Sequence, residues 1–257
     1  LVTIYRSILM LSKNKIKFIR SLQQKKIRNE TKCFVVEGRK GIEELLKENW
    51  SIKELYVSET IALKYKTLLR GKSFNIEPEN LIESASGLKN NKEGIAIVNF
   101  KIPEDIKWEN GFILYLDNIS DPGNLGTIIR TADWFGISHV VCNDCTVDFY
   151  NPKVIQSTMG AFSRVIPSYI NIDDLKNIIP KNYPIYATFL DGEPPNRLQE
   201  SEYGLLVMGS ESHGISESFL ALNPIKITIP SGSESITESL NVAIATSILC
   251  YEINCKK

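Results

Sequence analysis

The stretch that decides the fold is FILYLDNISDPGNLGTIIRTADWFG, residues 112–136. It opens with a continuous apolar run, 112–116, which is typical of a strand buried on both faces of a parallel sheet. A Pro-Gly loop follows Asp117, and a helix is expected to begin near Asn124 and to include 125–135. A strand–loop–helix junction of this kind, at the carboxyl edge of a parallel sheet, is where α/β folds bind ligands.

The same pattern continues outward along the chain. Four more apolar runs predict strands, at 139–142, 185–189, 205–208 and 225–229. Helices are expected between them, at 153–160, 173–179 and 217–222, and a long apolar helix at 239–253. Because that last helix carries apolar residues on every turn, it must be buried against the sheet or against another chain. The fold class is therefore α/β, with a parallel sheet in the C-terminal domain.

Upstream of this series, the sequence predicts a smaller α/β module. Strands are expected at 33–37, 52–57 and 94–99, and an amphipathic helix at 41–47. The polar stretch KIPEDIKWENG reads as a linker. The expected division is a substrate-binding domain over 1–100, a linker over 101–111 and a second domain over 112–257.

Charge separates the two parts of the chain. Residues 1–111 carry 21 lysines and arginines against 14 acids, whereas residues 112–257 carry 9 against 16. The N-terminal excess begins with a basic stretch that also has a partial helical stripe: Lys13, Lys15, Lys17, Arg20, Lys25, Lys26, Arg28 and Lys32. Such a module is a candidate for contacting nucleic-acid phosphates, and the alternative is a solvated basic surface without a partner.

The remaining composition points to a cytoplasmic protein without a metal. Five cysteines, an odd number, in a chain of this size indicate reduced thiols. Cys142 and Cys145 have CxxC spacing, but a zinc site needs a second ligand pair, and His139 and His213 are not placed to complete one. No apolar run is long enough to span a membrane. Residues 1–9 are expected to be an upstream extension, with Met10 the natural start.

The first candidate site lies in the opening stretch. Asn124 and Arg130 are six residues apart on the expected helix, and the free N–H groups at its start suit an anion. An arginine there provides a fork for phosphate or carboxylate, and the alternative is a surface arginine beside an ordinary capping asparagine. The chain has no Walker lysine and no GxGxxG, which disfavours nucleotide-triphosphate and Rossmann sites.

Two further loops follow buried strands. In the first, Gly209 and Gly214 flank Glu211, so a ligand could approach the backbone closely, and a plain turn is the alternative. The same loop holds Ser210, Ser212 and His213, but it lacks the GxSxG pattern of a serine hydrolase.

In the second loop, a strand stops at Pro230 and Ser239 is the expected cap of the closing helix. Asn241 is an amide early in that apolar helix and needs partners if it is buried, with local capping as the alternative.

Taken together and in this order, the three segments resemble the motifs of the SpoU/TrmH RNA methyltransferases. The matches are Asn124, Gly126 and Arg130, then Gly209, Glu211 and Gly214, then Ile229, Pro230, Ser239, Leu240 and Asn241. Residues 151–161 also resemble the family's segment between the first two motifs, and 34–46 more loosely resemble its RNA substrate-binding domain, which is similar to a ribosomal protein. Two departures are a long, serine-rich loop from Pro230 to Ser239 and Gln156 in place of a basic residue.

The resemblance implies a deep trefoil knot in the C-terminal domain, a homodimer, and S-adenosylmethionine as cofactor. It implies transfer of a methyl group to a ribose 2′-hydroxyl, in ribosomal RNA first and transfer RNA second, without a metal. The implied catalytic residues are Arg130, Asn124, Glu211 and Asn241, and the implied cofactor contacts are Thr188, Gly209, Ile229, Leu240 and Ser239. The competing hypotheses are a non-catalytic RNA-binding protein and a hydrolase that uses Ser210 or Ser212 with His213.

Overall fold

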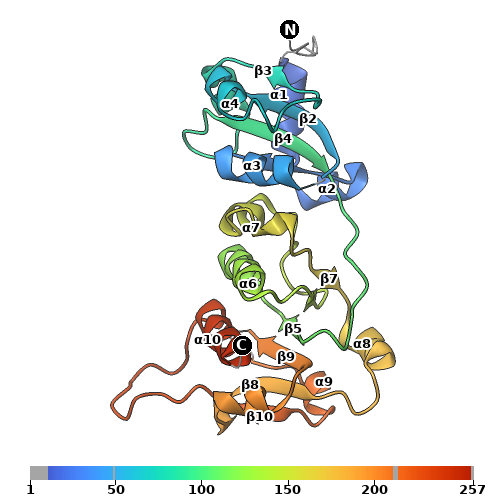
Figure 1. Cartoon of the computed structure of the whole chain (residues 1–257), viewed down its shortest axis with the longest axis vertical. Coiled ribbons are helices and arrows are strands. Elements are labelled where there is room, and N and C mark those ends of the chain that lie inside the picture. Colours follow the sequence, from blue (N-terminus) through green and yellow to red (C-terminus); the bar gives the residue numbers. More distant parts are fainter. Residues whose placement is uncertain (1–10, 49, 211–213, 256–257) are drawn as a thin grey trace. The chain divides into compact units, whose positions relative to one another are not determined.

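The computed structural model describes residues 11–48, 50–210 and 214–255. The described chain forms two compact units, and most of their elements are labelled in Figure 1. The first contains the residues up to Ile102 together with Tyr150–Ser163, and the second contains Pro103–Phe149 and the residues from Arg164 on. The boundary at 102–103 lies at the start of the expected linker, but residues 150–163, expected in the second domain, group with the first unit.

The first unit is a four-stranded sheet with helices. Its elements are α1 (Lys13–Ser21), α2 (Lys25–Thr31), β1 (Cys33–Glu37), α3 (Arg39–Lys47), β2 (Ile52–Val57), α4 (Glu59–Lys64), β3 (Asn75–Ile76), α5 (Glu79–Ala85), β4 (Gly94–Asn99), α7 (Pro152–Ser157) and the 3-10 helix η1 (Ala161–Ser163). The strand order is β1-β4-β2-β3, with β4 antiparallel to both of its neighbours. The three expected strands are confirmed, while β3, α4 and α5 are additional.

The N-terminal basic stretch is only partly available to a ligand. The guanidinium of Arg28 is buried and donates to the carbonyl oxygens of Leu22 and Gln23, each at 2.8 Å. Lys15 forms an ion pair of 2.7 Å with Glu54. Two of the charges assigned to a basic surface therefore hold the first unit together.

Residues 150–163 join the first unit through aromatic packing. Phe34 contacts Tyr150 with ring centroids 4.7 Å apart, and Trp50 contacts Phe162 at 5.9 Å. The Trp50 indole N–H also donates to the carbonyl oxygen of Ser163 at 3.0 Å. Burial of large aromatic side chains outweighs proximity in sequence, and it explains why this segment packs on β1.

The second unit is a six-stranded sheet with helices. Its elements are β5 (Phe112–Asp117), α6 (Pro122–Phe135), β6 (Val140–Cys142), β7 (Ser168–Tyr169), α8 (Ile172–Ile178), β8 (Ile185–Glu193), the 3-10 helix η2 (Pro195–Glu200), β9 (Gly204–Gly209), α9 (Glu217–Leu220), β10 (Ile225–Ile227) and α10 (Val242–Asn254). The order is β10-β8-β9-β5-β6-β7, and every neighbouring pair is parallel. The predicted parallel sheet is confirmed, with β7 as an extra edge strand.

The order of strands changes direction between β5 and β9. From β5 the chain moves to β6 and then β7 on one side, whereas β9, β8 and β10 all lie on the other side. Ligands bind in α/β sheets at such a switch point, beyond the carboxyl ends of the strands. Asp117 ends β5 and Gly209 ends β9, and these two residues are paired in the sheet.

Three element ends differ from the expectation. Helix α6 begins at Pro122 rather than near Asn124, because Asp121 caps it. Helix α10 begins at Val242 and is capped by Asn241 rather than by Ser239. Strand β10 ends at Ile227, and its pairing with β8 is irregular between Lys226 and Ile227.

Candidate active site

The start of α6 is set by local chemistry. The carboxylate of Asp121 accepts a hydrogen bond from the backbone N–H of Asn124 at 2.8 Å, and Pro122 occupies the first turn, where a missing N–H costs nothing. The helix ends at Gly136, which has a φ of 70°. Asn124 therefore lies inside the first turn and is not the residue that caps the helix.

Asn241 connects the closing helix to α6. Its side-chain oxygen accepts hydrogen bonds from the backbone N–H groups of Ala243 and Ile244, at 3.0 and 3.3 Å. Its side-chain nitrogen donates to the side-chain oxygen of Asn124 at 2.9 Å. Asn241 thus caps α10 with its side-chain oxygen and binds the first motif with its side-chain nitrogen. The second of these bonds orients the side-chain oxygen of Asn124.

The two helices that carry these residues pack against each other. The hydroxyls of Thr131 on α6 and Ser247 on α10 lie 3.1 Å apart, within hydrogen-bonding distance. One contact thus joins the helices at their starts and a second joins them about two turns further on. The pair forms a rigid support for side chains that project from α6.

Arg130 projects from α6 into solvent. Within the part of the chain that the structure describes, its guanidinium makes no hydrogen bond or ion pair. A guanidinium without a protein partner can donate two parallel hydrogen bonds to the oxygens of one phosphate. Arg130 and Asn124 lie on one helix, so the sequence expectation that they share a site is compatible with the fold.

The two residues that flank the loop after β9 are joined by backbone hydrogen bonds. Ser210 and Gly214 exchange backbone hydrogen bonds of 3.2 and 2.9 Å, and Gly214 has a φ of 64°. A Cβ at Gly209 would lie 2.4 Å from the Gly214 carbonyl carbon, so only glycine fits. The expected catalytic Glu211, and the Ser212 and His213 of the hydrolase hypothesis, lie outside the described residues.

Two of the expected cofactor residues, Thr188 and Ile229, lie within or just after neighbouring strands. Ala187 pairs with Val207, so Thr188 lies level with the end of β9, where its hydroxyl donates to the Val207 carbonyl at 3.3 Å. Ile229 comes just after β10, on the other side of β8.

The two remaining members of this expected set lie at the start of α10. Ser239 is exposed and Leu240 is 45% exposed, both directly before the Asn241 cap. Ile229 is half-buried and Leu240 is exposed, so both side chains offer apolar surface, whereas Gly209 is covered on its Cα by the Gly214 backbone. Apolar side chains of this kind suit the planar ring in the adenosine of S-adenosylmethionine.

The sequence analysis missed a polar network at the carboxyl end of β5. The buried carboxylate of Asp117 accepts hydrogen bonds from the Asn143 side chain and from the backbone N–H of Ser216, each at 2.8 Å. Asn143 also donates to the side-chain oxygen of Asn118 at 2.8 Å. A carboxylate that ends a wholly apolar strand was the only sequence signal. The network joins the loops after β5, β6 and β9.

The CxxC pair and His139 have structural surroundings. Cys142 is buried at the end of β6, its burial raises its pKa, and it forms no disulfide with the exposed Cys145. His139 is buried, and its Nε2 accepts a hydrogen bond from the Lys107 backbone N–H at 3.3 Å. Among the described residues, no cluster of three or more histidine, cysteine or acidic side chains is arranged to hold a metal ion, and no helix is long and apolar enough to cross a membrane.

The fold defines an α/β protein with a parallel sheet, and the strand order places a candidate ligand site at its switch point. Residues 111–251 match the family model of the SpoU rRNA Methylase family, and residues 13–96 match that of the MRM3-like substrate binding domain.

Individual relatives are similar over nearly the whole chain. The 23S rRNA (guanosine(2553)-2′-O)-methyltransferase RlmP of Bacillus subtilis is 31% identical over 93% of this chain and 95% of its own length. A solved structure from Porphyromonas gingivalis, assigned to the TrmH family of RNA methyltransferases, has a TM-score of 0.82 and 37% identity over 97% of this chain and 100% of that one. The AdoMet-bound rRNA methyltransferase of Sinorhizobium meliloti has a TM-score of 0.79 and 30% identity, over 96% and 95%. The chain belongs to the SpoU rRNA methylase family.

Proposed function

We propose that this protein transfers a methyl group from S-adenosylmethionine to a ribose 2′-hydroxyl of ribosomal RNA. The observation that carries the proposal is the hydrogen bond between Asn124 and Asn241, which joins the family motif on α6, the helix that presents Arg130, to the motif at the start of α10. Relatives of the same two-part extent are named as rRNA methyltransferases, which favours ribosomal over transfer RNA.

The ribose 2′-hydroxyl is a weak nucleophile, so the chain's own residues must activate it. A guanidinium stays protonated at neutral pH, so Arg130 is a poor base. It is better suited to hold the phosphate next to the reacting ribose and to donate to the hydroxyl oxygen, so that the phosphate assists removal of the proton. Asn124, oriented by Asn241, would hold Arg130 or the ribose, and Glu211 is proposed to hold the loop around them.

The cofactor supplies an activated methyl group on a sulfonium, so the protein has mainly to position the reactants. Thr188, Gly209 and Ile229 would border the adenosine, and Ser239 and Leu240 would close over it. A metal is not needed for this chemistry.

The first unit is proposed to bind the RNA. With Arg28 and Lys15 engaged within the protein, the lysines that remain exposed on α1 and α2, such as Lys17 and Lys25, would contact phosphates. The proposed domain division is 1–100, a linker over 101–111 and 112–257, with residues 150–163 packed on the first unit. Free cysteines favour the cytoplasm as location.

Two structural consequences of the family remain proposals. The first is a trefoil knot formed as α10 tucks through the preceding loops, for which the contact of α10 with α6 gives support. The second is a homodimer. Large apolar side chains are exposed on these helices, with Trp134 of α6 at 84%, Tyr251 of α10 at 59% and Ile244 of α10 at 54%. Exposed apolar surface of this extent on two packed helices favours burial against a second copy.

The test is methyl transfer to cellular RNA. Purified protein, tritiated S-adenosylmethionine and total RNA from a strain that lacks the gene are expected to give label in one RNA size class, as a 2′-O-methyl nucleotide. Failure to bind S-adenosylmethionine would instead support the alternative of a non-catalytic RNA-binding protein.

A further inference from the structure

The first unit contains a pocket that the proposed reaction does not use. It has a volume of about 250 Å³ and lies between the β1–α3 junction and the segment that includes α7. Its lining comes from three separate stretches: Glu37, Gly38, Arg39 and Lys40 at the β1–α3 junction, Gln156 and Met159 in the segment that includes α7, and Leu88 with Glu93 before β4. Gln156 is the residue at which the sequence departs from the family's usual basic side chain.

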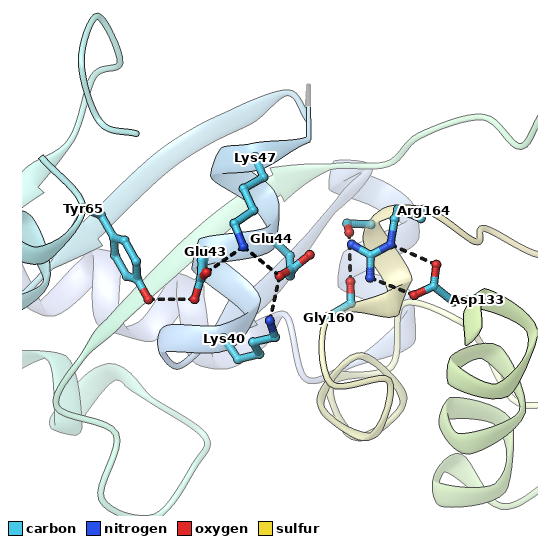
Figure 2. Close-up of polar contacts among 9 residues, drawn as sticks. Lys40, Glu43, Glu44, Lys47, Tyr65, Asp133, Gly160 and Arg164 are labelled. Atoms are coloured by element: carbon cyan, nitrogen blue, oxygen red, sulfur yellow. Dashed lines mark hydrogen bonds and ion pairs between the residues drawn. The ribbon is translucent and has the colours of Figure 1, made fainter. Parts of the chain in front are cut away.

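The walls of this pocket are held in place by close contacts. Gly160 has a φ of 101°, and a Cβ there would lie 2.6 Å from the Glu44 side chain, so the two segments touch closely at this point. Glu44 is itself fixed by Lys40 at 2.8 Å and Lys47 at 3.5 Å, and Lys47 also binds Glu43, as Figure 2 shows. The pocket is therefore preformed rather than a gap between loosely packed loops.

The floor of the pocket provides a hydrogen-bond acceptor. One carboxylate oxygen of Glu37 accepts hydrogen bonds from the Ser86 hydroxyl at 2.7 Å and the Gly87 backbone N–H at 2.8 Å. The other oxygen has no hydrogen-bond partner among residues 11–48, 50–210 and 214–255. Burial raises the pKa of Glu37, and the two hydrogen bonds oppose that shift. A partly buried carboxylate with an open oxygen favours a ligand that presents N–H donors.

The sides of the pocket combine apolar surface and positive charge. Met159 is 53% exposed and has a φ of 51°, so a flexible thioether lies open to a planar ligand. Arg39 and Lys40 have side chains 50% and 53% exposed, and each pairs with an acid, Glu93 at 3.7 Å and Glu44 at 2.8 Å. A carboxylate, an exposed thioether and nearby cations match the edge, the face and the phosphate of one nucleotide.

We propose that this pocket takes an unpaired guanine of the RNA. Guanine presents two adjacent N–H donors on its Watson–Crick edge, which a carboxylate accepts side by side. Met159 packs on the base, Gln156 provides a further amide contact, and Arg39 and Lys40 approach the backbone phosphate. The inference rests on the proposed RNA-modifying function, but the guanine held here is a contact nucleotide and not the one that receives the methyl group.

The test uses fluorescein-labelled RNA oligomers in which one central nucleotide lies between runs of uridine. The central nucleotide is guanosine, inosine, adenosine, cytidine or uridine, and binding to the full chain is followed by anisotropy at low salt. We expect the guanosine oligomer to bind about tenfold tighter than the uridine oligomer, with inosine between them because it lacks the second donor. Pairing the guanosine strand with its complement is expected to abolish that preference.

Two variants separate the edge contact from the face contact. Glu37→Gln keeps an acceptor for Ser86 and Gly87, so it folds, and it should remove the preference for guanosine. Met159→Gly removes the thioether at a position of positive φ that glycine adopts without strain. It should weaken binding of all five oligomers alike. Glu79→Gln, an exposed acid of the same unit outside the pocket, is the matched control and should leave the preference unchanged.

Equal affinity for the five oligomers, no binding of any of them, or a guanosine preference that survives Glu37→Gln would overturn the proposal. Methyl transfer to total RNA is read separately. Methylation without a guanosine preference rejects the pocket alone, and a guanosine preference without methylation rejects the proposed function alone.

Discussion

The side-chain nitrogen of Asn241 donates to the side-chain oxygen of Asn124 at 2.9 Å, although the two residues are 117 positions apart. The same Asn241 side chain caps α10 through its oxygen. One amide thus has two functions, and each uses a different atom. The closing helix cannot shift along its axis without breaking the bond to Asn124 or moving that residue, which lies on the same helix as Arg130.

This division of atoms allows the two functions of Asn241 to be separated. Asn241→Asp keeps the capping oxygen but loses the donor to Asn124, so we expect nearly unchanged thermal stability and reduced kcat for methyl transfer. Asn241→Ala loses both and should also be destabilised by about 1 kcal/mol. Equal activity of Asn241→Asp and the unmodified protein would contradict the positioning role.

Arg130 is expected to be essential for transfer but not for folding. Because its side chain is exposed, Arg130→Ala should unfold at the same temperature as the unmodified protein and bind S-adenosylmethionine normally. Its kcat should decrease by about 100- to 1000-fold, as for loss of a transition-state donor. Arg130→Lys keeps the charge and loses the fork, so recovery of full activity in that variant would contradict bidentate phosphate binding.

Arg28 is expected to matter for stability rather than for RNA. Arg28→Met leaves the carbonyls of Leu22 and Gln23 without their buried donor and should cost about 2–4 kcal/mol in the free energy of unfolding. Lys25→Met, at an exposed position in the same helix, should change stability by less than about 0.5 kcal/mol and weaken RNA binding in a salt-dependent way. Urea unfolding and RNA titrations at two salt concentrations distinguish these outcomes.

His139 should make stability depend on pH. Burial, followed by the charge of Lys107, lowers its pKa in the folded protein below the ordinary value of 6.5. Above pH 6.5 the His139 ring is neutral in both the folded and the unfolded protein, and the free energy of unfolding has its full value. As the pH decreases below 6.5, the unfolded state binds a proton first, so the free energy of unfolding decreases until the folded ring is also protonated.

Urea unfolding at pH 7.5 and pH 5.5 tests this expectation. The decrease between the two values should be smaller in His139→Gln than in the unmodified protein. Comparing the two proteins separates the contribution of His139 from that of the carboxylates, which both proteins share. Identical pH profiles would show that this histidine contributes nothing to the dependence.

The proposed dimer should depend on the exposed face of α6 and α10. In sedimentation velocity, the unmodified chain of 29.0 kDa is expected at twice that mass, and Trp134→Glu is expected as a monomer. Leu63→Glu replaces a side chain of the first unit that is 70% exposed and should leave the dimer intact. A monomeric unmodified chain would refute the dimer.

The sequence by itself determined the class of fold and most of its long elements. Apolar runs such as 112–116 predicted the buried parallel strands, because a strand covered on both faces has no polar side to alternate. Local signals were weaker at element ends. Asp121 rather than Asn124 caps α6, and Asn241 rather than Ser239 caps α10, because more than one capping residue was present at each site.

Only the tertiary structure decided which distant residues meet. The bond from Asn241 to Asn124 joins two positions whose neighbouring residues give no sign of the contact. The same holds for the burial of Arg28 and for the packing of residues 150–163 on the first unit. The physical reason is that periodicity and capping act over a few residues. Strand order and aromatic burial instead minimise exposed apolar surface over the whole chain, and they place a polar side chain in a site, in a core or at a surface irrespective of its local pattern.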